Sequence, residues 1–154
     1  MTARIEWRRP KPNIDADIKP FWDACAEHRL VVMQCKTCGA RYWPATYCRN
    51  HKNEPFFGSL EWVTVSGRGT VAEHNVHHVA FDPTFQDQIP YAYGMVRTEE
   101  GPMLSGNIID VDPDSVYIGM PVEVVFIDVV TPQGEEFTIP QWRPLERAEA
   151  AENA

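Results

Sequence analysis

The sequence predicts a mainly β protein in which an N-terminal helix and a rubredoxin-like zinc ribbon precede a five-stranded barrel of the OB-fold type. Three observations predict this class. Two short knuckles carry metal-ligating side chains, Cys35-x2-Cys38 and Cys48-x2-His51. Beyond them the chain consists almost entirely of β-prone runs separated by turn residues. Thirteen prolines disfavour a helix bundle, because proline is poorly tolerated inside helices.

The amino-acid composition indicates in which compartment the protein is expected and which partners it can bind. Hydrophobic residues make up 44% of the sequence, but no apolar run approaches the ~18 residues that suggest a bilayer span. The basic N-terminus is not followed by an apolar segment, which argues against a secretory or twin-arginine signal. We therefore expect a cytoplasmic protein without membrane contact. A formal charge of −8 disfavours nucleic acid as a partner, because binding to phosphates requires a cationic surface.

The N-terminal segment predicts an extended arm followed by a helix. Residues 1–13 are polar, basic and proline-containing, which is typical of an arm. Pro20 suits the first turn of a helix. The residues behind it that recur at the spacing of one helical face are Phe21, Ala24, Cys25 and His28. We expect a helix over residues 19–28.

A short β-prone run then leads into the first knuckle, and the ribbon is expected to end near residue 57. The last ten residues are rich in Ala and Glu, which is typical of a flexible tail. The predicted division into arm and helix, zinc ribbon, OB-fold and tail is 1–29, 30–57, 58–144 and 145–154.

Six β-prone runs follow the ribbon. They cover residues 60–65, 70–79, 91–97, 103–109, 122–130 and 137–142. Between the fourth and fifth runs, Asp112, Pro113 and Gly119 predict a single helical turn with an N-cap, a proline at the first position and a terminating glycine. If the first two runs form one strand bent at Gly67 and Gly69, the order is three strands, a short helix and two strands. This is the order of an OB-fold.

The two knuckles predict a structural zinc ion. Three of the four cysteines lie within fourteen residues at ligand spacing, which in a reducing compartment indicates metal binding and not disulfides. The predicted ligands are Cys35, Cys38, Cys48 and His51. Cys25 and Glu54 are the alternatives to His51, and a degenerate ribbon with buried thiols is the alternative to a metal site. Four protein ligands leave no coordination position for water or substrate, so the zinc would stabilise the fold.

The ribbon is cationic within an acidic chain. Residues 35–53 contain no acidic side chain, and their basic residues are Lys36, Arg41, Arg49 and Lys52. The aromatic residues Tyr42, Trp43 and Tyr47 lie among them. One interpretation is a docking face for a phosphorylated, planar ligand, with cations on phosphate and a ring for stacking. The other, which we favour, is a solvated ribbon whose aromatic side chains cover the metal.

Reactive groups are scarce in the remaining sequence. His74, His77 and His78 lie in one strand-like run, where polar residues lining a barrel strand are the favoured interpretation over a second metal or acid–base site. Of the three histidines, His78 is the one whose substitution we would test first. Cys25, on an apolar helix face, is expected to be a core thiol. No nucleophile elbow, phosphate loop, dinucleotide fingerprint or HExxH helix is present. We predict no catalytic residue and expect a binding protein.

The arrangement resembles the zinc-ribbon/OB-fold acyl-CoA-associated family, formerly a domain of unknown function. The resemblance is collinear from about residue 15 to residue 144. The matching segments are Pro20-Phe21-Trp22, Gln34-Cys35-x2-Cys38-Gly39, Trp62, Ser66-Gly67-Arg68-Gly69-Thr70-Val71, Pro90-Tyr91, Gly101-Pro102-Met103-Leu104, Ile118-Gly119-Met120-Pro121-Val122 and Ile139-Pro140-Gln141-Trp142-Arg143-Pro144. His78 lies where the family often has a histidine. The family usually closes its second knuckle with Cys, whereas this chain has His51.

The resemblance implies a non-catalytic subunit of a heteromeric thiolase-like enzyme, such as a thiolase, aldolase or acyltransferase, that acts on acyl-CoA C–C bonds. The thiolase-like partner would carry the nucleophilic cysteine. Acyl-CoA would be a shared ligand, with its phosphates or ring system near Lys36, Arg41, Trp43, Arg49 and Lys52. The alternative function is a nucleic-acid-binding ribbon/OB module, supported by the local charge of the ribbon. A third is a free-standing thioesterase that depends on His78 or Cys25.

Overall fold

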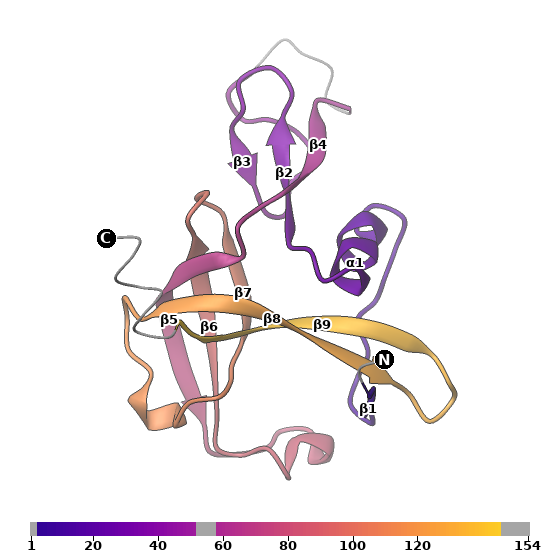
Figure 1. Ribbon diagram of the computed structural model, residues 1–154, viewed down its shortest axis with the longest axis vertical. Coiled ribbons are helices and arrows are strands. Elements are labelled where there is room, and N and C mark those ends of the chain that lie inside the picture. Colours follow the sequence, from indigo (N-terminus) through magenta and orange to yellow (C-terminus); the bar gives the residue numbers. More distant parts are fainter. Residues whose placement is uncertain (1–2, 52–57, 146–154) are drawn as a thin grey trace.

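The computed structural model describes residues 3–51 and 58–145, which form two sheets and a helix (Figure 1). The elements in chain order are β1 (Ile5–Glu6), α1 (Lys19–Ala26), β2 (Val31–Cys35), β3 (Arg41–Tyr42), β4 (Leu60–Thr64), β5 (Arg68–His77), the 3-10 turn η1 (Pro83–Phe85), β6 (Tyr91–Thr98), β7 (Met103–Ile108), the 3-10 turn η2 (Pro113–Ser115), β8 (Pro121–Val130) and β9 (Glu136–Pro144). Within the described residues, no helix has the length and apolar character that a bilayer crossing requires.

The larger sheet closes into the predicted five-stranded OB-fold barrel. Its barrel strands run in the order β8-β5-β6-β7-β9, and β8 also pairs with β9 to close the ring. The turn η2 separates the first three strands from the last two, as predicted, and the Asp112 carboxylate accepts a hydrogen bond from the Asp114 N–H at 3.1 Å. Buried side chains that alternate along the strands fill the interior, among them Val71, Val96, Val122 and Trp142.

The prediction of one long first barrel strand was wrong. β4 pairs antiparallel with β2, with Cys35 opposite Leu60, and so belongs to the three-stranded ribbon sheet β3-β2-β4. β3 is only two residues long, so β4 provides most of the backbone partners of β2. The chain changes sheets at Gly67, whose φ is 77° and whose carbonyl accepts from the Val124 N–H at 2.7 Å. The domain limits stay predictions, because residues 52–57 and 146–154 lie outside the described residues.

The helix confirms three of its four predicted face positions. Phe21, Ala24 and Cys25 are buried, but α1 ends at Ala26 and His28 is exposed with a φ of 57°. The chain reverses in this left-handed conformation, which turns the imidazole away from the helix face. The ring instead stacks on Phe126 at 5.4 Å, and its Nε2 lies 3.1 Å from the Asp128 carboxylate. The end of the helix is thereby attached to β8.

Asp128 makes this attachment sensitive to acid. The Thr138 hydroxyl donates to it at 2.7 Å, and this bond, followed by the contact with His28, lowers the pKa of the carboxyl below its usual 3.8. A lowered folded-state pKa stabilises the fold above the unfolded-state pKa, and this stabilisation is lost as the pH falls through the folded value. We expect Asp128→Asn to lower the unfolding free energy at pH 7 by about 1 kcal/mol, since it weakens charge-assisted bonds. Urea denaturation at pH 7 and below pH 4 checks this: the difference between variant and wild type should shrink in acid.

The N-terminal arm runs along the closing strands of the barrel. β1 pairs in parallel with β8, with Ile5 opposite Val129. Cations of the arm contact acidic side chains of the barrel, and these pairs are Arg4–Glu136 at 3.0 Å, Arg9–Asp87 at 2.9 Å and Lys11–Glu135 at 2.6 Å. The Arg9 guanidinium also lies over the rings of Trp7 and Phe85. The arm is therefore held by backbone pairing with β8, by these ion pairs and by ring contacts.

Candidate metal centre

The two knuckles are brought together at the outer end of the ribbon. The first is the turn between β2 and β3, where the Cys35 N–H donates to the Ala40 carbonyl at 2.8 Å and the Gly39 N–H to the Cys35 carbonyl at 2.9 Å. Gly39 has a φ of 73°, which a glycine adopts without strain. The second knuckle follows β3 and contributes Cys48 and His51. The ligand atoms of all four predicted residues lie within 4.8 Å of one another.

This geometry fits a zinc ion. Zinc–sulfur bonds of 2.3 Å at tetrahedral angles place ligand atoms about 3.8 Å apart. Cys38 Sγ and Cys48 Sγ are 3.6 Å apart, too far for a disulfide and close to the tetrahedral edge. Three sulfurs and an imidazole nitrogen form one of the donor sets that structural zinc takes in ribbons. Bound zinc would be held by Cys35, Cys38, Cys48 and His51, and would tie the β2–β3 turn to the segment that follows it.

Donors around the thiols favour their metal-binding form. The backbone N–H of Cys38 lowers the pKa of Cys35, and the Ala40 N–H, followed by the Asn50 amide, lowers that of Cys38. The Asn50 amide nitrogen lies 3.5 Å from Cys38 Sγ. Burial raises the pKa of Cys48, and the Tyr42 hydroxyl opposes this at 3.4 Å from the sulfur. Sequence reasoning assigned no contact to Asn50, because such bonds depend on how the loop turns.

Tyr42 is expected to tune the zinc affinity. Its hydroxyl accepts from the Arg49 N–H at 3.3 Å, so its own proton is available to the Cys48 sulfur. Partners of metal ligands typically contribute 10–100-fold to metal affinity, so we expect Tyr42→Phe to weaken zinc binding about tenfold at unchanged stoichiometry. Competition against a colorimetric chelator measures this. Tyr93→Phe, in the barrel, is the matched control and should leave the affinity unchanged.

The alternatives to His51 are not supported by the described residues. Cys25 is fully buried in α1 and is not one of the clustered ligands, and burial raises its pKa to about 12. This is the environment expected for a core thiol. Glu54 lies outside the described residues.

The predicted cations of the ribbon that the structure describes each have a contact within it. Lys36 donates to the Gly58 carbonyl at 3.0 Å, and Arg41 donates to the Gln34 amide oxygen at 2.9 Å. Arg49 lies over the Tyr42 ring. Lys52 lies outside the described residues. These contacts position the three cations without using their full donor capacity, and their role toward CoA phosphates stays a prediction.

Trp43 lies between the ribbon and the helix. Its ring contacts Phe21 at 4.2 Å and Trp62 at 5.9 Å between centroids. The ring thus packs against both the helix and the ribbon, and its stacking on a ligand stays a prediction.

The histidines of β5 do not form a cluster. His77 stacks on Tyr91 at 4.7 Å, whereas His74 faces Gly94 across the strand pair. His78 is exposed just past the end of β5. The described metal-ligating residues that come together are those of the ribbon alone.

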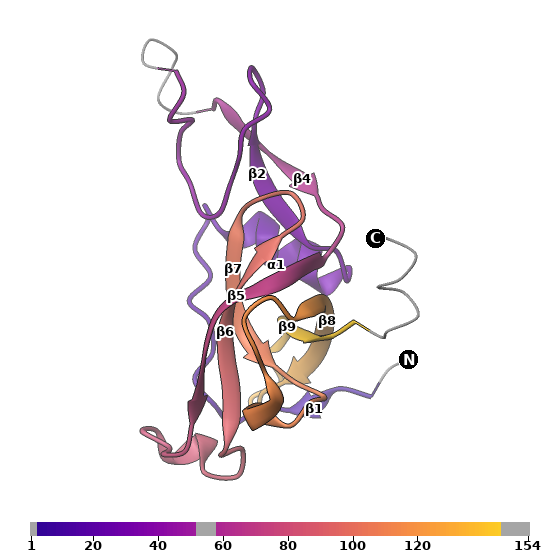
Figure 2. The same ribbon diagram turned by 90° about the vertical axis from the view of Figure 1, so that its left-hand side faces the viewer.

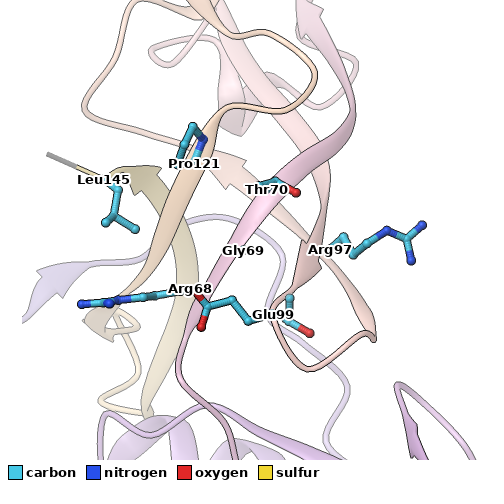
Figure 3. Close-up of a pocket in the computed structure, with 8 residues that line it drawn as sticks. Arg68, Gly69, Thr70, Arg97, Glu99, Pro121 and Leu145 are labelled. Atoms are coloured by element: carbon cyan, nitrogen blue, oxygen red, sulfur yellow. The ribbon is translucent and has the colours of Figure 1, made fainter. Parts of the chain in front are cut away.

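A cavity of about 230 Å³ lies where β5, β6 and β8 meet. Figure 3 shows that its two arginines, Arg68 and Arg97, point in opposite directions. Gly69 between them allows close packing, since a Cβ there would lie 2.4 Å from the Arg97 carbonyl oxygen. The diverging guanidinium groups do not form a joint anion site.

Comparison with known proteins places this architecture in a family. Family models described as the ChsH2 rubredoxin-like zinc ribbon domain and the ChsH2 C-terminal OB-fold domain match residues 22–54 and 62–127. A DUF35 domain-containing scaffold protein of Methanocaldococcus jannaschii is 39% identical over 98 residues, which cover 63% of this chain and 67% of the relative.

Two further relatives carry names that refer to enzymes. A probable enoyl-CoA hydratase alpha subunit of Thermomonospora curvata is 33% identical over 139 residues, which cover 88% of this chain but only 40% of that subunit. A solved structure described as Ltp2-ChsH2(DUF35) aldolase has a TM-score of 0.73 at 29% identity, and the match covers 87% of this chain and 98% of the other. With both halves matched in order, the chain belongs to the ChsH2/DUF35 family of zinc-ribbon OB-fold proteins.

Proposed function

We propose that this chain is the non-catalytic zinc-ribbon and OB-fold subunit of a heteromeric acyl-CoA enzyme whose catalytic partner is thiolase-like. The names of the hydratase subunit and of the aldolase structure support a partner subunit in acyl-CoA chemistry. The bound zinc is structural. Lys36, Arg41 and Arg49 are the described cations that would meet the CoA phosphates, and Trp43 would offer a ring for stacking.

The proposal rests on one observation: three of the four cysteines are clustered with His51, and the fourth is buried. Thiolase-like chemistry begins with attack of a cysteine thiolate on a thioester, and a buried, protonated thiol is inert in that step. Cys35, Cys38 and Cys48 are gathered with His51 in the metal cluster. Cys25, the remaining cysteine, has no exposed surface and a pKa of about 12. The nucleophile of such a reaction would therefore come from another chain.

Exposed apolar side chains offer a surface for that chain. Val79 and Phe81 follow β5 and are 61% and 91% exposed, and Tyr117 and Ile118 follow η2 and are 54% and 70% exposed. The turns η1 and η2 lie toward the end of the barrel away from the ribbon (Figures 1 and 2). Large exposed apolar residues in neighbouring loops are typical of protein interfaces.

Co-expression with a thiolase-like protein tests the proposal. We expect the two chains to co-elute in size-exclusion chromatography and to cleave an acyl-CoA C–C bond only together. Cys25→Ser should keep the activity, whereas loss of the partner's nucleophilic cysteine should abolish it. Phe81→Asp should weaken assembly at least tenfold, and Ile14→Asp, on the arm, is the matched control. Turnover by this chain alone, or a partner that is fully active without it, would contradict the proposal.

A further inference from the structure

A cleft of about 310 Å³ lies where the helix, the ribbon and the barrel meet. In Figure 1 α1 lies between the ribbon strands and β9. Aromatic rings from all three parts line the cleft: Trp22 of α1, Trp43 after β3 and Tyr93 of β6. Strands β7 and β9 add the polar side chains of Ser105, Asn107 and Gln141. This cleft was not predictable from sequence patterns, because its walls come from segments that are far apart in the chain.

The cleft is neutral. Charged residues make up 23% of the chain, but the described residues that line the cleft include no Asp, Glu, Lys or Arg. A phosphate or carboxylate placed there would lose its hydration without gaining a cation, which is strongly unfavourable. The cleft therefore selects an uncharged ligand or the uncharged part of a larger one.

Its size and its walls favour a flat ring system. A cavity of about 150 Å³ lined by apolar side chains takes up benzene, so about 310 Å³ accommodates about two fused rings. Three indole and phenol rings provide flat, polarisable surfaces on which such a ligand stacks or makes edge contacts.

One wall of the cleft carries an amide side chain whose donor and acceptor branches can be told apart. The Gln141 side chain accepts from the Asn107 N–H at 2.8 Å. A backbone N–H can only donate, so the atom that it meets is Oε1, and the Gln141 NH₂ group is on the other branch of the amide. This donor is suited to a carbonyl oxygen on the ligand.

We propose that this cleft binds a neutral, ring-containing group of about two fused rings that bears a carbonyl acceptor. Trp22, Trp43 and Tyr93 would hold its faces, and the Gln141 NH₂ group would donate to its carbonyl. A cyclic acyl group of a thioester has this chemistry, and in that respect the assignment extends the proposed function. The cleft itself is complete within this chain.

Titration of the isolated 154-residue chain with prodan, a neutral dimethylaminonaphthalene ketone, tests the assignment. We expect saturable binding at one site with a blue-shifted emission. Anilinonaphthalene sulfonate, a naphthalene dye with a negative charge, should not compete. Failure to saturate at 100 µM protein, or displacement by the sulfonate, would overturn the assignment. No partner chain takes part, so this result is independent of the assembly experiment.

Two variants test whether the dye binds in this cleft. Ser105→Trp fills the cleft from an exposed position and should weaken binding at least tenfold, whereas Ser115→Trp, at an exposed serine of η2 outside the cleft lining, should bind as the wild type does. Gln141→Glu keeps the oxygen that accepts from Asn107 and replaces the donor by a carboxylate oxygen, so it should also weaken binding at least tenfold. Thermal denaturation and zinc content would show that each variant is folded. Wild-type affinity in either folded variant would contradict the proposed position.

Discussion

Cys48→Ser is expected to abolish stoichiometric zinc binding and to unfold the ribbon. Cys48 is buried and its sulfur lies 3.6 Å from that of Cys38, so its loss leaves three clustered ligands and a hydroxyl that binds zinc poorly. Structural zinc in small peptides contributes about 10–16 kcal/mol of apparent binding free energy, which is folding free energy. The three short ribbon strands have few buried side chains to replace it. Because Trp43 packs on Phe21, the loss should also loosen α1.

Elemental analysis and amide NMR spectra measure this result. Zinc should fall from one per chain to none, and the signals of β2, β3 and β4 should collapse while those of the barrel persist. Cys25→Ser is the matched control, since it removes a buried thiol outside the cluster and should keep one zinc per chain. Full zinc occupancy in Cys48→Ser would refute the ligand assignment.

Trp142→Ala is expected to lower the unfolding free energy by about 3–5 kcal/mol, the range for removing a large aromatic side chain from a core. The side chain is 2% exposed and lies where the barrel closes. Trp142 pairs with Val124 of β8 and with Ile108 of β7, and its backbone carbonyl accepts a hydrogen bond from the Ile109 N–H at 2.8 Å. Gly106 leaves room for the ring, since a Cβ there would lie 3.0 Å from its Cδ1. Backbone pairing around the ring prevents the strands from collapsing into the space left behind.

Urea denaturation monitored by circular dichroism gives the comparison. Trp7→Ala removes the same kind of side chain from the arm, where the half-buried ring meets Phe137 edge-on at 6.0 Å and the Arg9 guanidinium at 5.3 Å, and a loss of about 1 kcal/mol is expected there. Equal decreases in the unfolding free energy for Trp142→Ala and Trp7→Ala would show that Trp142 does not stabilise the closure of the barrel.

The metal centre and the barrel strands were predictable because their signals are local. Two i, i+3 knuckles identify the ligands regardless of the rest of the chain, and the structure brings those four side chains together. Turn residues likewise mark the ends of the strands. The single turn after Asp112 was predicted from three residues and is present as η2. The family resemblance added the pairing of a zinc ribbon with an OB-fold in one chain, which comparison with known proteins confirmed.

The errors involve partners that are distant in sequence. Residues 60–64 alternate in the same way whether they extend a barrel strand or pair with β2, and only the free edge of β2 opposite β3 decides between them. His28 was assigned to a helix face by spacing, but the chain leaves the helix two residues earlier and the ring meets Phe126, 98 residues further on. Spacing does not report where a helix ends when no glycine or proline marks the position.

The ion pairs of the N-terminal arm have a consequence for handling the protein. Exposed pairs such as Arg4–Glu136 and Lys11–Glu135 each contribute little and are screened by salt. Molar salt would therefore weaken these ion pairs, whereas the backbone pairing of β1 with β8 would persist and a zinc-bound ribbon would stay intact. A chelator would instead act on the ribbon, so strong salt and chelation loosen different parts of the molecule.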